Sequence, residues 1–492
     1  NSGYTSYGAV VTVTLTDSVG TYTTVSDADG NYRIDGIAYG AYSVTFSGPH
    51  LQPVTRTGTL ASGQTVTQNV WMNVLSPVVT VTAPLEGANI SVTPFMVTGV
   101  AVEAETVTIT VTNDGGTAVY QGGITNGAFS IPIEMKLGQS YIDISASNSR
   151  IERYIKGVNV TSRFLIRNLG DNGNVAVMET SGNYDAKNAD GSYNTLPRQE
   201  LAKEYIRAHA DTFDFLVFLS TFDYPKVEPD ALAFYSGVKN DISGIGIPIS
   251  DNTAQFGSAG KLQGTIDMGN MTALASNPFG PELAKTVDVL NHEIMHRYGS
   301  YVRFKNPDGT LNSNLIGRHG SHWSYLLDTQ GSLMLGSAWK SNNDGTFTSA
   351  AVRNSYSPLD LYLMGIVPKE QVPPMLLIDN PAIDKTQLPQ RGATVSGTAT
   401  TVTIDDIIAA EGERIPNSTT AQKNFNVGFV LLTRAGDNPA ATTQAVETLR
   451  KAWPASFAEL TQNKGGFGNI PASLDLGIES PVEGATVIGP DV

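Results

Sequence analysis

The first third of the chain alternates β-branched and polar residues. Residues 11–16 and 107–111 are examples of this alternation. Neighbouring side chains in a strand point to opposite faces of the sheet, so the pattern predicts strands with one face toward a core. Turn residues such as those at 27–31 separate the segments. We therefore expect two all-β sandwich domains, over residues 1–75 and 76–160.

From residue 161 to residue 475 the pattern changes to mixed α and β, which predicts an α+β domain. Apolar residues recur at helical spacing in some segments and form short continuous runs in others. The expected elements are helices over residues 197–211, 281–298 and 442–453 and strands over residues 213–219 and 261–268. The sequence thus predicts a multidomain protein with one larger C-terminal catalytic or binding domain.

A short repeat links the second β domain to the end of the chain. Residues 83–90 read Ala-Pro-Leu-Glu-Gly-Ala-Asn-Ile, and residues 480–487 read Ser-Pro-Val-Glu-Gly-Ala-Thr-Val. The repeat predicts that a further module of the same kind begins at residue 476 and is truncated at residue 492. We expect further β modules in a longer polypeptide.

Composition and charge exclude several classes of function. The formal net charge is -15 and no dense Lys/Arg run occurs, which argues against nucleic acid or an anionic membrane as partner. The chain has no cysteine, so any metal must be held by His and carboxylates. No apolar run approaches the roughly 18 to 20 residues needed to span a bilayer. We expect a secreted or cell-surface, extracellular protein.

The helix expected over residues 281–298 carries a histidine pair at metal-binding spacing. His292 and His296 are four residues apart, so their rings project from one helix face a single turn apart. Two imidazole nitrogens at this spacing can bind one Zn²⁺ at about 2.0–2.1 Å. Glu293 is placed to take a proton from the attacking water rather than to bind the metal.

A catalytic zinc site commonly has three protein ligands and one open position. Four of the six histidines lie between His292 and His322. We expect His322 as the third ligand, because the aromatic and aliphatic residues after it can fix its ring. His319 is the alternative third ligand, and Asp360 is a less favoured one.

Other side chains near the motif are candidates for supporting roles. The candidates for stabilising a transition-state oxyanion are His319, Tyr298, Tyr362 and Arg318. Asp360 is a candidate for orienting a ligating imidazole, or it caps a helix. Met364 is a candidate for an apolar floor beneath the metal, although a buried Met is more often only part of the core.

Acidic turns at residues 27–31, 190–191 and 342–345 raise the question of Ca²⁺. The first lacks the remaining carboxylates and the terminal Glu of a calcium loop. Turn geometry explains all three without a metal. Ca²⁺ is therefore only weakly supported, and Zn²⁺ is the expected cofactor.

Three resemblances to known families follow from these residues. Residues 24–34, with Gly36, Ile37 and residues 40–44, resemble the carboxypeptidase regulatory-like domains of bacterial surface proteins, which implies a prealbumin-like fold. The second β domain resembles an immunoglobulin-like (Ig-like) sandwich. His292, Glu293 and His296 match the motif of the zincin metallopeptidases. Gly299 fits the extended motif of one zincin subgroup, but Val302 stands where that subgroup has its third His.

Residues 357–365, with the segment His322-Trp323-Ser324, resemble secreted bacterial zincin-like proteins. The resemblance implies a zinc metallopeptidase, a hydrolase of the HExxH type that acts on a protein or peptide substrate with Glu293 as general base. One alternative is a surface or adhesive protein that uses an inactive zincin-like domain as a scaffold. Another alternative is a metal hydrolase for a different bond, such as a glycan-linked amide.

Overall fold

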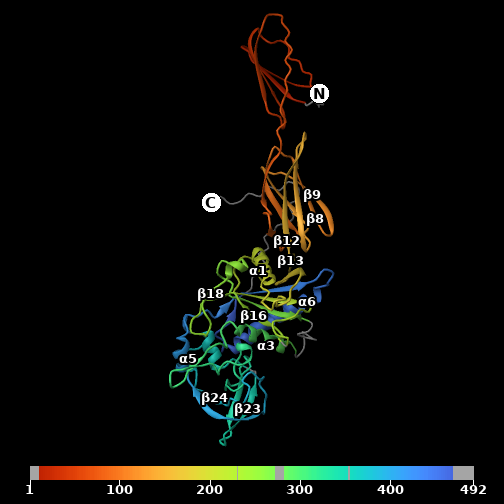
Figure 1. Ribbon diagram of the computed structural model, residues 1–492. Coiled ribbons are helices and arrows are strands. Elements are labelled where there is room, and N and C mark those ends of the chain that lie inside the picture. The colour runs from red at the N-terminus through yellow and green to blue at the C-terminus, as the bar shows by residue number, and fades with distance from the viewer. Residues whose placement is uncertain (1–9, 230, 272–281, 353–354, 469–492) are drawn as a thin grey trace. The chain divides into compact units, whose positions relative to one another are not determined.

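The computed structural model describes the chain except residues 1–9, 230, 272–281, 353–354 and 469–492 (Figure 1). The chain forms two compact units, Asn1–Leu165 and Ile166–Val492. The further module expected over residues 476–492 lies outside the described residues. Within the described ranges, no helix is both long and apolar enough to span a membrane.

The first β domain contains one antiparallel four-stranded sheet with the order β2-β1-β3-β4. Its strands are β1 (Thr12–Thr16), β2 (Thr21–Val25), β3 (Gly40–Ser47) and β4 (Val54–Leu60). Val13, Leu15, Val44 and Phe46 form a small core on one face of this sheet, and extended segments pack against it. Residues 65–72 also alternate β-branched and polar side chains, but they form no strand in the structure.

The second β domain is a sandwich of two sheets, as its alternation predicted. The strand orders are β10-β7-β5 and β6-β12-β11-β8-β9. The strands are β5 (Val78–Ala83), β6 (Ala88–Asn89), β7 (Phe95–Val102), β8 (Thr106–Asn113), β9 (Gly116–Gly123), β10 (Ala128–Ile133), β11 (Gly138–Ser147) and β12 (Glu152–Ser162). Val107, Ile109 and Val111 alternate into the core between the sheets.

A six-stranded sheet lies at the centre of the C-terminal unit, with the order β13-β14-β28-β15-β19-β16. Its strands are β13 (Phe164–Asn172), β14 (Val175–Gly182), β15 (Phe215–Ser220), β16 (Phe234–Gly237), β19 (Gly264–Asn270) and β28 (Val427–Thr433). Strands β14, β28, β15 and β19 run parallel, and the edge strand β16 runs antiparallel to β19. Tyr235 on β16 lies against Gly264, where a Cβ atom would be 2.3 Å from the ring.

Helices and smaller elements complete this unit (Figure 1). The helices are α1 (Leu196–His209), α3 (Glu282–Met295), α4 (Pro358–Met364), α5 (Ile404–Glu411) and α6 (Ala440–Leu460), with 3-10 turns η1 (Thr253–Phe256), η2 (Arg318–Gly320) and η3 (Lys369–Gln371). The short strands are β17 (Lys239–Asn240), β18 (Ser250–Asp251), β20 (Phe304–Lys305), β21 (Leu311–Asn312), β22 (Ser337–Ser341), β23 (Thr346–Val352), β24 (Met375–Asp379), β25 (Thr394–Ser396), β26 (Thr398–Val402), β27 (Asn424–Phe425) and β29 (Gly466–Phe467).

Helix α3 is anchored to the core along one face. Its expected apolar stripe is present, because Val287, Leu290 and Ile294 are all buried. Asn291 fixes it to helix α6, where Trp453 Nε1 donates to Asn291 Oδ1 at 2.8 Å. Tyr356 Oη also donates to the Asn291 carbonyl at 2.6 Å. The helix that carries the histidine pair is therefore held on two sides.

A buried ion pair joins β19 to helix α1. Arg198 Nη2 lies 3.2 Å from Asp267 Oδ1, and both side chains are almost fully buried. Tyr184 and Tyr224 also donate hydrogen bonds to Asp267. Leaving one partner of such a pair alone in the interior costs roughly 3–5 kcal/mol, so the network strongly specifies the position of β19.

Candidate metal centre

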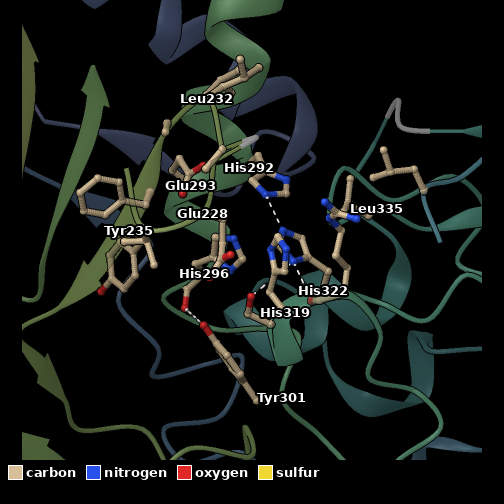
Figure 2. Close-up of a pocket in the computed structure, with 18 residues that line it drawn as sticks. Glu228, Leu232, Tyr235, His292, Glu293, His296, Tyr301, His319, His322 and Leu335 are labelled. Carbon is tan, nitrogen blue, oxygen red and sulfur yellow. Dashed lines mark hydrogen bonds between the residues drawn. The ribbon is translucent and has the colours of Figure 1, made fainter. Parts of the chain in front are cut away.

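The structure brings His292, His296 and His322 together, as the sequence predicted. His292 and His296 lie one turn apart at the end of α3, and His322 reaches them from the loop after η2 (Figure 2). One ligand nitrogen from each ring lies within 4.8 Å of the other two. Among the described residues this is the one cluster of three His or carboxylate side chains that can hold a metal ion.

Backbone carbonyls orient two of the three rings. His292 Nδ1 lies 2.7 Å from the Leu333 carbonyl, and His322 Nδ1 lies 3.0 Å from the Arg318 carbonyl. A carbonyl only accepts, so each Nδ1 carries the proton and each Nε2 presents a lone pair. This outer hydrogen bond is the usual partner of a metal-binding imidazole.

The Nε2 atoms of His292 and His322 face each other. His292 Nε2 and His322 Nε2 are 3.1 Å apart. Two nitrogens bound to one tetrahedral Zn²⁺ at about 2.0–2.1 Å lie ~3.4 Å apart, so this pair already has the spacing of two ligands. Without a cation the lone pairs repel each other. The donor set therefore fits a Zn²⁺ ion.

His296 completes the set from a different angle. Its ring centroid lies 4.9 Å from those of His292 and His322, and its plane is at 87° to both. His296 Nδ1 is buried without a hydrogen-bond partner.

Burial and neighbouring histidines favour the neutral form of His296 and His322. Burial, followed by the neighbouring His292, lowers the pKa of His322 to about 3. Burial and the neighbouring His292 and His322 lower the pKa of His296 well below its ordinary value. Neutral imidazole is the form that binds a metal, so these ligands need not lose a proton at neutral pH.

Glu293 lies next to the three rings with one oxygen unused. A backbone hydrogen bond from Tyr235 on β16 holds the carboxyl group, whereas Glu293 Oε2 is buried without a hydrogen-bond partner. Burial, followed by the negative charge of Asp267, raises the pKa of Glu293 to about 8. A carboxyl group with a pKa near neutrality can both accept and release a proton.

A cavity of about 400 Å³ opens beside the three histidines. Its lining includes Glu293 and both remaining candidates from the η2 turn, Arg318 and His319. His319 is exposed, with a left-handed backbone (φ 56°), and its ring centroid lies 5.8 Å from that of His322. His319 thus lines the cavity without joining the metal cluster.

Three other candidates, Tyr298, Tyr362 and Met364, do not line this cavity. Tyr298 and Met364 are buried in the core, 2% exposed each, and neither lines the cavity. The Tyr362 hydroxyl accepts a hydrogen bond from the Arg414 backbone N–H instead. None of these three side chains lines the cavity beside the histidines.

Asp360 contacts no imidazole. Its carboxylate accepts hydrogen bonds from Trp323 Nε1 at 2.8 Å and from Ser332 Oγ at 2.6 Å. It also forms the capping box of α4 with Ser357. The helix-capping alternative is therefore the one observed. Because Asp360 joins the loops that contain His322 and Leu333, it fixes the metal centre indirectly.

The acidic turns use their carboxylates locally. Asp27 Oδ1 accepts from the backbone N–H groups of Asp29 and Asn31. Asp190 and Asp344 make the same kind of bond to the residue two positions later. Each carboxylate therefore stabilises its own turn.

Some residues of the site were not predicted. The role of the Leu333 carbonyl could not be predicted from the sequence, because every residue has a backbone carbonyl group. Tyr301 and Tyr235 line the cavity, and Tyr301 Oη donates to the His296 carbonyl at 3.0 Å. Tyr301 lies five residues beyond His296, which was the available signal. Tyr235 lies far upstream in sequence, and only the pairing of β16 with β19 brings it to the cavity.

Comparison with known families gives a clear result for the N-terminal part. Residues 2–73 match the family model of the carboxypeptidase regulatory-like domain. This segment is similar to a regulatory-like domain. The match bears out the first resemblance and does not extend to the C-terminal unit. No curated protein matches the chain.

Solved structures match about a third of the chain. A candidate carbohydrate-binding protein from Bacteroides uniformis has 11% identity and a TM-score of 0.14, and the match covers 31% of this chain and 87% of that chain. The BSP domain of a biofilm-associated protein has 17% identity and a TM-score of 0.12, covering 32% and 25%. The FN1–FN3 domains of chicken CNTN1 have 10% identity and a TM-score of 0.13, covering 30% and 52%.

Proposed function

We propose that the C-terminal unit is a zinc-dependent peptidase that acts outside the cell on protein or peptide substrates. The observation that supports it is the convergence of His292, His296 and His322 beside Glu293 in one cavity. His292 Nδ1 and His322 Nδ1 each donate a hydrogen bond to a backbone carbonyl, and His296 Nδ1 is buried without a hydrogen-bond partner. The regulatory-like and Ig-like domains are then spacers that precede the catalytic unit.

Each residue has a distinct part in this mechanism. His292, His296 and His322 would hold a Zn²⁺ ion, which when bound would supply Lewis acidity and lower the pKa of water to near 7. Glu293 takes a proton from the attacking water at Oε2 and passes it to the leaving amine. A backbone hydrogen bond from Tyr235 holds the Glu293 carboxyl group in place.

His319 is placed to stabilise the oxyanion of the tetrahedral intermediate. It lines the same cavity and lies in an exposed turn, where its imidazole is accessible to a substrate. Arg318, the preceding residue, also lines the cavity and adds positive charge. Donors near the reacting carbonyl are worth several kcal/mol in such sites.

A second candidate function is an extracellular adhesive or structural protein whose C-terminal unit serves as a scaffold. The match of residues 2–73 to the regulatory-like family and the adjacent sandwich favour it, because such β domains commonly space or attach a larger unit. Under this function the metal would stabilise the fold without catalysis. The unpaired Oε2 of Glu293 is unnecessary for that role.

A protease assay distinguishes the two functions. The purified chain should cleave casein, stop when a zinc chelator is added and recover when Zn²⁺ is restored. Cleavage that persists after complete zinc removal would contradict the mechanism. A zinc-loaded protein that cleaves no peptide would favour the scaffold, or a hydrolase for another bond such as a glycan-linked amide, which a glycopeptide substrate would reveal.

A further inference from the structure

A histidine and two glutamates meet where the first β domain adjoins the second. His50 lies in the turn that follows β3, and Glu103 and Glu105 lie in the loop between β7 and β8. His50 Nδ1 is 2.8 Å from Glu103 Oε2, and His50 Nε2 is 2.8 Å from Glu105 Oε1. Both β domains belong to one compact unit of the chain, and these contacts join them at their shared boundary.

This arrangement requires a charged imidazole. A carboxylate only accepts hydrogen bonds, so both ring nitrogens of His50 must carry a proton. A neutral imidazole has a single N–H group, and its other nitrogen would turn a lone pair toward a carboxylate. Deprotonation of His50 therefore removes one of the two hydrogen bonds and the charge attraction of both.

The backbone on both sides of this contact has an uncommon conformation. The φ angles of His50 and Glu103 are 55° and 56°, in the left-handed region. Few residues other than glycine adopt that region, and His is enriched there whereas Glu is not. Such conformations persist where the surrounding contacts fix them. The contact between the two side chains is one of the interactions that can fix them here.

Neutral groups supply further hydrogen bonds at the same boundary. The Leu75 N–H, in the linker between the two domains, donates to the His50 carbonyl at 2.8 Å. Asn148 Nδ2 donates to the Leu75 carbonyl at 3.0 Å and to the Glu103 carbonyl at 2.8 Å. Backbone and amide groups do not titrate near neutral pH, so these bonds hold the domains together whether or not His50 is charged.

We propose that protonated His50 holds the first β domain rigidly against the second, and that this joint loosens as the pH rises above neutrality. The hydrogen bonds to Glu103 and Glu105 raise the pKa of His50 above its ordinary value of 6.5, against the opposing effect of burial. The contribution of His50 is therefore complete below pH 6.5 and is lost as the pH rises through the raised pKa. Arg150 also reaches the joint, where its Nε donates to the Pro49 carbonyl at 2.8 Å, and its guanidinium stays charged throughout this range.

The test measures the spread of distances between the two β domains in the whole chain. The chain has no cysteine, so two fluorophores can be attached through Val19→Cys and Val119→Cys, at side chains that are 76% and 60% exposed. Val19 lies between β1 and β2, and Val119 lies on β9. Time-resolved energy transfer gives the distance distribution at about pH 6 and about pH 9. We expect a narrow distribution at the lower pH and a broader one at the higher pH.

His50→Gln should lose this pH response and show the broad distribution at both pH values, because a neutral amide replaces the imidazolium. The matched control is His209→Gln, which removes a histidine 3.0 Å from the Asp171 carboxylate in the C-terminal unit and should leave the response unchanged. Glu105→Gln should move the transition to a lower pH. A distribution that is the same at both pH values in the unaltered chain, or a pH response that persists in His50→Gln, would overturn the proposal.

Discussion

Replacement of Glu293 with Gln is expected to slow casein cleavage by about 10²- to 10⁴-fold while Zn²⁺ remains bound. Gln has nearly the shape of Glu but cannot accept the proton from the attacking water. The three histidines are unchanged in this variant, so zinc content should stay at one ion per chain. Initial rates of cleavage and metal analysis of the same preparation measure the two effects together.

The matched control for that variant is Glu370→Gln, which makes the same chemical change in the exposed turn η3, outside the cavity. It should cleave at the rate of the unaltered chain. If Glu293→Gln retained full activity, Glu293 would not be the general base. If Glu293→Gln lost its zinc, the carboxylate would act as a ligand or as a structural support.

Removal of His322 is expected to weaken zinc binding by more than ~100-fold, a larger loss than outer hydrogen-bonding partners give. His322→Ala takes away one of the two nitrogens that already face each other at 3.1 Å. His319→Ala should keep the zinc and lose activity, because His319 lines the cavity without belonging to the cluster. Competition with a chromogenic zinc chelator measures both affinities.

The two substitutions are controls for each other, since they lie three residues apart in the same loop. Circular dichroism should show that both variants keep the fold. If His319→Ala lost zinc and His322→Ala kept it, the ligand assignment would be reversed. If both variants kept full zinc affinity, neither histidine would be the third ligand.

The sequence predicted helix α3, which carries His292, well because a helix is a local structure. The spacing of His292 and His296, and the buried stripe from Val287 to Ile294, depend only on residues within four positions of each other. The pairing of strands that are distant in sequence was harder to predict. Strand β28 is fully buried between β14 and β15, although more than 200 residues separate it from either strand. Its apolar run, Val-Gly-Phe-Val-Leu-Leu-Thr, was the signal that could have revealed it.

The C-terminal end of helix α6 was predicted incorrectly for a different reason. Its predicted end was residue 453, yet the helix continues through Pro454 to Leu460. Proline normally ends or kinks a helix because it lacks the N–H donor. Here Trp453 and Phe457 on either side of the proline are buried in the core, and their packing supports the continuation.

The metal centre was predictable as far as ligand chemistry allowed. With no cysteine and six histidines in the chain, few combinations could form a site, and His322 was correctly placed beside the helical pair. The supporting residues were less predictable, because their roles depend on the path of the chain. Tyr298 and Met364 were wrong for this reason, as was Asp360 as a contact of a ligating imidazole.

The most direct test is X-ray absorption spectroscopy of the zinc-loaded protein at the zinc edge. The peptidase mechanism predicts one Zn²⁺ per chain with three imidazole nitrogens at about 2.0–2.1 Å and one further oxygen from solvent. The signal of one imidazole should disappear in His322→Ala. A site with only two imidazoles, with four protein ligands and no open position, or with no bound zinc would contradict the peptidase mechanism.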